Sequence, residues 1–137
     1  LRYKEETLDA ARRQGYVSTL LGRRRALPEI CSRNRNFREL AERVAVNTPI
    51  QGTAADIIKL AMLRVDEHLR AEHPGTHMLL QVHDELLFES PVSDVERLAE
   101  HVRDGMETAL DPYVKLQVRL RVAVSRGPNW AEMQPIR

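Results

Sequence analysis

The first helical pattern along the chain is short. Leu8 and Ala11 fall on one face of residues 3–13, and the residues around them are mostly charged. This spacing predicts an amphipathic helix with those two side chains directed inward. Gly15 follows at the position where a glycine commonly ends a helix. We therefore expect a short helix that stops at Gly15.

Two strand-like segments follow this helix. Residues 16–19 and 24–27 flank a four-residue connection that contains Gly22, and Pro28 comes directly after them. A glycine-containing turn between two such segments indicates a β-hairpin, and a proline ends a strand. We expect a hairpin over these residues and a loop over residues 29–36.

Two longer apolar stripes of helical spacing occupy the middle of the chain. They predict helices over about residues 36–47 and over residues 53–72. Pro49 and Gly52 lie between the two stripes, and proline lacks the backbone N–H group that a helix interior uses. The sequence therefore predicts two separate helices with a break between them.

Two sequence motifs predict where helices begin. Thr53 is followed three residues later by Asp56, and Ser93 is followed three residues later by Glu96. Both pairs resemble a capping box, in which a side-chain oxygen accepts a backbone N–H of the first turn. The first pair predicts that a helix starts at residue 53. The second pair predicts the start of a third amphipathic helix, over residues 93–107.

The remaining pattern is typical of strands. Residues 78–82 and 86–89 flank the turn at His83-Asp84-Glu85, and residues 117–125 alternate between apolar and polar side chains. The order of elements predicts an α+β fold. We expect a small antiparallel sheet with helices packed on one face, preceded by a helix and a β-hairpin.

Charge is unevenly distributed although the net charge of the 137-residue chain is only +1. Residues 1–43 carry 11 Lys and Arg against 6 Asp and Glu, a local charge of +5. Residues 44–116 carry 6 against 13, a local −7, and residues 117–137 carry 4 against 1, a local +3. The basic first third is compatible with a surface that faces phosphates, and equally with an ordinary solvated face.

Asp84 and Glu85 are the clearest candidates for chemistry. Adjacent carboxylates repel, and each raises the pKa of the other unless a cation compensates. Hard oxygen ligands suit Mg²⁺, and a pair of such ions promotes phosphoryl transfer. An Asp-Glu pair is ordinarily a solvated turn, but its apolar flanks make this a hairpin of the core. Two carboxylates do not complete a two-metal site, so at least one more must come from elsewhere.

The turn and its neighbours resemble a known family. Gln81-Val82-His83-Asp84-Glu85 is similar to motif C of family A DNA polymerases of the bacterial polymerase I type, a palm hairpin that bears a metal-binding Asp. The resemblance runs from about Gly15 to Trp130. Its other segments are Gly15-Tyr16-Val17, Gly22-Arg23-Arg24, Ala41-Glu42-Arg43, Asn47, Pro49, Gln51-Gly52-Thr53-Ala54-Ala55-Asp56 and Asn129-Trp130.

The resemblance implies a role for each of six residues. Asp84 and Glu85 would be the catalytic acidic pair, with Asp84 a ligand of Mg²⁺ and Glu85 a neighbour that tunes the site or contacts metal. His83 would lie near the primer terminus. DNA-binding residues that follow the minor groove of the primer–template would be Arg43, Asn47 and Gln51.

The three residues assigned to the minor groove also fit purely structural roles. Arg43 would then pair with Glu39, Asn47 would be a helix C-cap, and Gln51 would be a cap before Thr53. The sequence leaves both roles open for each of the three.

The resemblance also implies what the chain lacks. The family's other catalytic Asp, its triphosphate-binding fingers helix and its thumb would lie before Leu1. Residues 1–35 would be the end of the fingers subdomain, and residues 36–137 the C-terminal half of the palm. We expect a piece of a cytoplasmic, monomeric DNA polymerase of replication and repair, inactive alone. Its partners would be primer–template DNA and deoxynucleoside triphosphates, with no membrane.

Two other functions remain possible from sequence. A stand-alone nucleic-acid-binding module would use the basic first third, but Phe, Tyr and Trp make up only 4% of residues, which leaves few rings for base stacking. A metal-dependent nuclease built on Asp84 and Glu85 would need further His or carboxylate ligands, and the sequence offers no obvious set.

Overall fold

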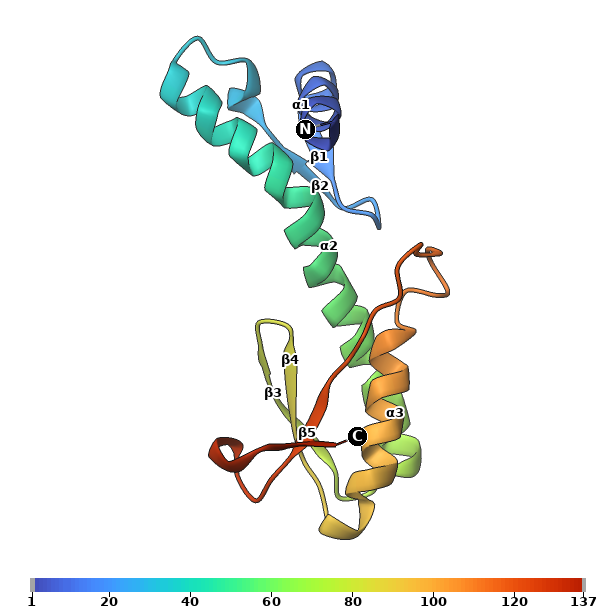
Figure 1. Cartoon of the computed structure of the whole chain (residues 1–137). Coiled ribbons are helices and arrows are strands. Elements are labelled where there is room, and N and C mark those ends of the chain that lie inside the picture. The colour runs from blue at the N-terminus through green and yellow to red at the C-terminus, as the bar shows by residue number, and fades with distance from the viewer. Residues whose placement is uncertain (1, 137) are drawn as a thin grey trace. The chain divides into compact units, whose positions relative to one another are not determined.

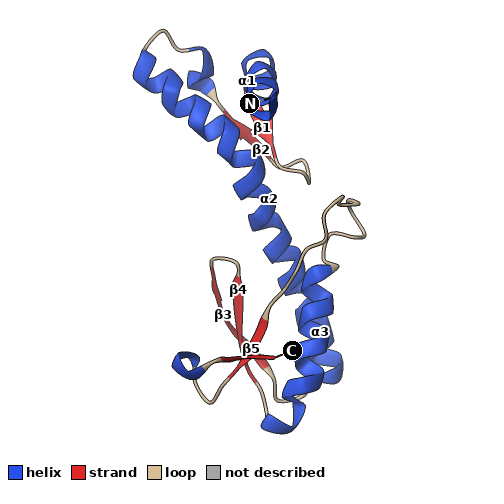
Figure 2. Cartoon of the chain, in the orientation of Figure 1, coloured by secondary structure: helices blue, strands red, loops and turns tan. Residues whose placement is uncertain are grey.

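Helices alternate with short antiparallel hairpins along the chain (Figures 1 and 2). The computed structural model describes residues 2–136. It comprises two compact units, Leu1–Asp56 and Ile57–Arg137. The long helix α2 (Arg35–Glu72) contributes its first part to unit 1 and its second part to unit 2.

Unit 1 begins with the predicted helix, α1 (Arg2–Gln14), in which Leu8 and Ala11 are buried. Gly15 ends it with φ of 75° and donates its N–H to the carbonyl of Ala11 at 2.8 Å. Such a left-handed residue costs little when it is glycine, because no Cβ is present. The first predicted helix and its end are therefore confirmed.

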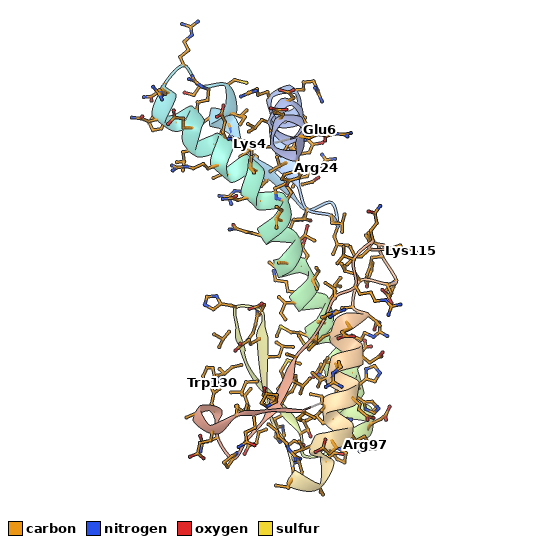
Figure 3. All side chains as sticks on the ribbon, in the orientation of Figure 1. Lys4, Glu6, Arg24, Arg97, Lys115 and Trp130 are labelled. Atoms are coloured by element: carbon orange, nitrogen blue, oxygen red, sulfur yellow. The ribbon has the colours of Figure 1, made fainter. Side chains whose placement is uncertain are left out.

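The predicted hairpin follows as β1 (Tyr16–Ser18) and β2 (Arg24–Ala26), paired antiparallel with Tyr16 opposite Ala26. Gly22 lies in its turn with φ of 84°. The guanidinium of Arg24, which Figure 3 labels, lies 4.6 Å from the ring centre of Tyr16 on the paired strand. After β2 the chain forms a short 3-10 helix, η1 (Pro28–Cys31), where the sequence predicts only loop.

The core of unit 1 lies between α1, the hairpin, η1 and the first part of α2. It consists of small and medium apolar side chains, namely Leu8, Ala11, Val17, Leu27, Ile30, Ala41 and Ala45. Each element contributes one or two of these side chains. The burial of their apolar surface therefore holds all four elements together, and no single pair of elements forms the core alone.

The predicted break in the middle of the chain is wrong. α2 is one helix of 38 residues with Pro49 inside it. The Thr53–Asp56 capping box is therefore also wrong, because Thr53 lies in the helix interior, where its hydroxyl donates to the carbonyl of Pro49 at 2.5 Å. Proline weakens a helix but does not end it when other contacts hold the next turn in place.

Unit 2 contains the second predicted hairpin and the third predicted helix. β3 (His77–Val82) pairs antiparallel with β4 (Glu85–Glu89), with an irregularity in register between Met78 and Leu80. α3 (Val95–Glu107) follows a short 3-10 helix, η2 (Val92–Asp94). The N-cap of α3 is Asp94 and makes no side-chain capping bond, so the predicted capping box of Ser93 and Glu96 is wrong.

The core of unit 2 joins α2, α3 and one face of the hairpin. Its buried members are Val65, Leu69, Leu98 and Val102, and Met78, Phe88 and Met106 pack against them. Gly105 lets the two helices approach closely, because a Cβ there would lie 3.1 Å from Cγ2 of Val65. β3 is only partly covered, because Leu79 and Leu80 are both about half exposed.

The last predicted strand is only partly correct. β5 covers Val124–Arg126 and pairs with β6 (Gln134–Ile136), and a 3-10 helix, η3 (Trp130–Glu132), lies between them. Residues 117–123 are not a strand, and Val118 is 77% exposed. An alternating pattern becomes a strand only where a neighbouring strand accepts its hydrogen bonds.

The fold is α+β with small antiparallel sheets, as the sequence predicts, and the helices of unit 2 pack on one face of its first hairpin. No helix within residues 2–136 is long and apolar enough to cross a membrane.

Candidate functional site

The two strands of the β3–β4 hairpin are joined by a turn of two residues, His83 and Asp84, and Val82 pairs with Glu85 across its base. His83 has φ of 55°, a left-handed conformation that side chains with a Cβ rarely adopt. The side-chain amide of Gln81 donates to the carbonyl of His83 at 2.9 Å and bridges the turn. A strained residue that its neighbours hold in place is typical of functional turns.

The side chains of His83, Asp84 and Glu85 at this turn are exposed. No salt bridge within residues 2–136 involves the carboxylate of Asp84 or that of Glu85. No group of three or more His, Cys, Asp or Glu in that part of the chain could hold a metal ion. Asp84 and Glu85 thus offer the hard oxygen donors that Mg²⁺ prefers, but only part of a full ligand set. The residues present fit one side of a metal site that further ligands would complete.

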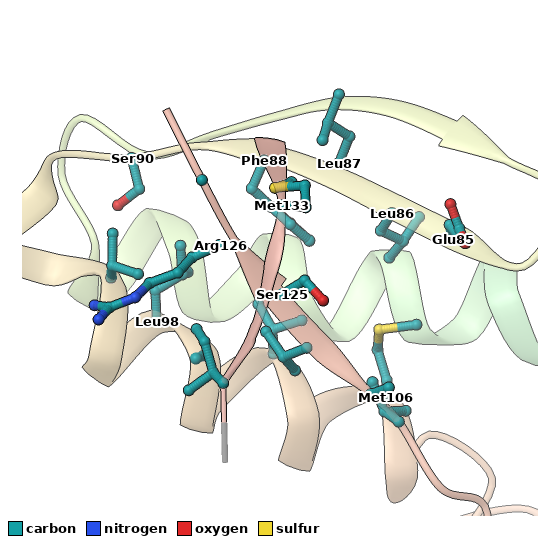
Figure 4. A pocket seen from close by; sticks show the side chains of 18 of the residues that line it. Glu85, Leu86, Leu87, Phe88, Ser90, Leu98, Met106, Ser125, Arg126 and Met133 are labelled. Carbon is teal, nitrogen blue, oxygen red and sulfur yellow. The ribbon is translucent and has the colours of Figure 1, made fainter. Parts of the chain in front are cut away.

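A groove of about 460 Å³ begins at these carboxylates and runs between β4, α3 and β5. In Figure 4, Leu98 and Met106 of α3 and Leu86 and Phe88 of β4 face one another across it. Ser125 of β5 lies between these two groups in the same view. The groove is therefore lined by both apolar and polar side chains, and its charged residues are Asp84, Glu85, Arg121 and Arg126.

Neither strand beside this groove is fully paired within the described residues. The sheets there are two-stranded, with β4 next to β3 and β5 next to β6. One edge of β4 and one edge of β5 consequently have backbone N–H and C=O groups available for another strand.

The three other candidate residues lie on α2 in unit 1. Arg43, Asn47 and Gln51 are all exposed and spaced by four residues, so they form one polar stripe along the helix. The alternative that Arg43 pairs with Glu39 is not found within residues 2–136, where Glu39 instead accepts from Nε of Arg35 at 2.7 Å. Both capping alternatives are wrong as well, because α2 continues through Asn47 and Gln51.

The candidate residues therefore form two groups. His83, Asp84 and Glu85 lie together on one turn of unit 2, and the polar stripe lies in unit 1. The structure brings together the members of each group.

A second polar cluster in unit 2 has no counterpart in the sequence analysis. His73 is fully buried; its Nδ1 lies 2.5 Å from Oδ2 of Asp94, and its Nε2 lies 2.6 Å from Nδ1 of His101. The hydrogen bond from His73, helped by Arg97, holds the pKa of Asp94 below its ordinary value. This cluster connects the residue that follows α2 to the start and the middle of α3.

Sequence reasoning also missed the contacts that the β1–β2 turn makes with α2. Thr19 packs so closely on Gly52 that a Cβ at Gly52 would lie 2.6 Å from Cγ2 of Thr19. Gly52, between two stripes of helical spacing, is the signal that could have indicated this close approach.

With this geometry established, comparison with known proteins identifies the class. The family model described as DNA polymerase family A matches residues 1–132. The chain belongs to DNA polymerase family A. This confirms the resemblance that its motifs indicate.

Similar proteins include the DNA polymerase I of Deinococcus radiodurans, 54% identical over 94% of this chain, and that of Geobacillus stearothermophilus, 50% identical over 94%. The chain spans only 13% and 14% of those two proteins. Among solved structures, the POL domain of Pol1 from M. smegmatis, in complex with DNA primer-template and dNTP, matches with a TM-score of 0.81 and 50% identity. That match covers 88% of this chain and 20% of the other.

Proposed function

We propose that this chain is part of a template-directed DNA polymerase of replication and repair. The observation that carries the proposal is the exposed Asp84-Glu85 pair on a strained hairpin turn, in a chain that belongs to family A. The partners would be primer–template DNA and deoxynucleoside triphosphates, and the Pol1 neighbour whose structure contains both supports this. The site would operate in the bacterial cytoplasm as part of a monomer.

In this proposal Asp84 is a ligand of Mg²⁺, and Glu85 contacts the same ion or tunes the site. The bound ions would activate the primer 3′-hydroxyl and stabilise the leaving pyrophosphate. The contribution of the hairpin is positional. Two paired strands and the Gln81 bridge hold the carboxylates in a fixed place, which limits the reorganisation that metal binding requires.

The site would be completed by a carboxylate from outside this chain. The groove supports this part of the proposal, because Asp84 and Glu85 line it together with residues of β4 and β5, two strands that each have one edge without a partner strand among residues 2–136. A strand from the rest of the protein would pair with those edges and bury its apolar side chains against Leu98 and Met106. Its end would then lie beside the turn.

Arg43, Asn47 and Gln51 would contact the minor groove of the primer–template, with His83 near the primer terminus. Purine N3 and pyrimidine O2 accept hydrogen bonds in every Watson–Crick pair, so donors on one exposed stripe detect the shape of a pair without reading sequence. In this assignment residues 1–35 belong to the fingers subdomain and residues 36–137 to the palm.

The test is primer extension by the full-length protein with Asp84→Ala and, as a matched control, Glu89→Ala. Glu89 is also exposed and acidic, but it lies at the end of β4 that is away from the turn. Because even groups that only support metal ligands change activity 10- to 100-fold when removed, loss of the ligand itself should lower incorporation by more than about 100-fold. Primer–template affinity should change little, since phosphate and groove contacts supply it. The control should stay active.

Normal incorporation by Asp84→Ala would refute the metal-ligand role. The isolated 137-residue chain should give no extension with Mg²⁺ and all four nucleotides. Extension by this chain that disappears in Asp84→Ala would show instead that the missing carboxylate lies within it.

A further inference from the structure

Residues 49–52 are the intrinsically weakest part of α2. Pro49 has no N–H to donate to the carbonyl of residue 45, and its ring crowds that carbonyl. Residue 52, three positions later, is glycine, and only proline disfavours a helix interior more than glycine does. The structure nevertheless continues α2 through both positions, so other contacts must stabilise this turn of the helix.

Thr53 forms the first of these contacts. Its hydroxyl donates to the carbonyl of Pro49 at 2.5 Å and accepts the backbone N–H of Leu20, in the β1–β2 turn, at 2.9 Å. One side chain therefore links the turn of α2 that contains proline to a segment more than thirty residues away. A valine at this position would have nearly the same shape but neither hydrogen bond.

Arg23, at the other end of the same hairpin turn, forms the second set. Its Nε donates to Oδ1 of Asp56 at 2.8 Å, and its Nη2 donates to the carbonyl of Gly52 at 3.1 Å. Thr19 adds van der Waals contact with Gly52, where no Cβ intervenes. The hairpin turn thus contacts α2 at three positions within a single turn and a half, immediately after Pro49.

These contacts bear on the polar stripe. Residues four apart on an α-helix are offset by about 40° around its axis, so Arg43, Asn47 and Gln51 share one face only while α2 stays helical through Pro49. A break there, as the sequence alone predicts, would move Gln51 out of line with the other two.

We propose that the β1–β2 turn, residues 19–23, is a positioning element that holds α2 helical across Pro49 and Gly52 and so keeps Gln51 on one face with Arg43 and Asn47. The consequence of this positioning for DNA contacts rests on the proposed function. The structural part stands independently of it.

Amide hydrogen exchange of the 137-residue chain tests the structural part. Thr53→Val should speed exchange of the amides of residues 51–56 about tenfold relative to those of residues 60–70, because two hydrogen bonds are lost. Thr53→Ser keeps the hydroxyl and should exchange like the native chain. Arg23→Ala should act like Thr53→Val, whereas Arg24→Ala, one residue on and directed at Tyr16, should not. Unchanged exchange in both Thr53→Val and Arg23→Ala would overturn the proposal.

The functional part uses the full-length protein and a primer whose terminal purine lacks N3. The native protein should extend this primer more slowly than the ordinary one. Thr53→Val should shrink that penalty, and Thr53→Ser should restore it. A full penalty in Thr53→Val, with none in Gln51→Ala, would overturn the positioning of Gln51. No penalty in the native protein would instead count against the minor-groove role itself, and the exchange measurements would still decide the positioning element.

Discussion

Gly52→Ala separates the intrinsic preference of α2 from the way the hairpin turn packs on it. On an exposed helix this substitution stabilises, because alanine is about 1 kcal/mol more favourable than glycine in a helix interior. Here the new Cβ would lie 2.6 Å from Cγ2 of Thr19, closer than two carbon atoms approach without displacement. The next nearest atom, Nη2 of Arg23 at 3.4 Å, would be tolerated.

The cost of this clash decides whether Gly52→Ala stabilises or destabilises unit 1. Thr19 is only 5% exposed, and its β-branched side chain has few alternative rotamers. Its hydroxyl also accepts the N–H of Arg23 at 3.2 Å, so rotation away from Gly52 would break that bond. Overpacking of this kind typically costs about 1–3 kcal/mol, which offsets or exceeds the gain in helix propensity. We expect Gly52→Ala to destabilise unit 1 by up to about 2 kcal/mol.

The informative comparison adds Thr19→Ser, which removes Cγ2 and keeps the hydroxyl. In that background Gly52→Ala should be neutral or stabilising by up to about 1 kcal/mol. Because the two units need not unfold together, stability is best followed by exchange of protected amides in the core of unit 1, such as those of Ala41 and Ala45.

Two outcomes would refute this reasoning. Stabilisation by Gly52→Ala in the native background would mean that Thr19 does not press on α2. Equal destabilisation in both backgrounds would mean that some contact other than Cγ2 of Thr19 is responsible.

Three further predictions concern other parts of the chain. Because the hydrogen bond from His73 lowers the pKa of Asp94 below its ordinary 3.8, folding gains stability above that pH and loses it as the pH falls through the folded value. Asp94→Asn should remove this acid dependence in a pH titration of unfolding, and an unchanged titration would contradict it. Leu110→Ala should lower the unfolding free energy in urea by about 2–5 kcal/mol, since Leu110 is 1% exposed; a loss below about 1 kcal/mol would show that its cavity collapses. In the full-length protein, Arg43→Ala and Gln51→Ala should each weaken primer–template use by about 1–3 kcal/mol. Steady-state kinetics on templates of different sequence should show similar losses, and a base-specific defect would exclude minor-groove contacts.

The sequence by itself determined the elements whose signals are local. α1 ends at Gly15 and the first hairpin turns at Gly22 because glycine accepts a positive φ, and both positions follow from the residue type alone. The β3–β4 hairpin with its carboxylate turn and the amphipathic face of α3 also follow from short-range patterns. The motifs were sufficient to place the chain in family A, which the comparison confirms over residues 1–132.

The tertiary structure decided the features whose partners are distant in sequence. α2 continues through Pro49 because Arg23 and Thr53 connect it to the hairpin turn, and no local rule contains that contact. The alternating residues 117–123 do not form a strand, because pairing depends on a neighbour and not on the pattern. His73 and Asp94 are 21 residues apart and meet only when α2 and α3 pack. Local preference sets which elements are possible, and burial and hydrogen bonding between distant segments set which of them form.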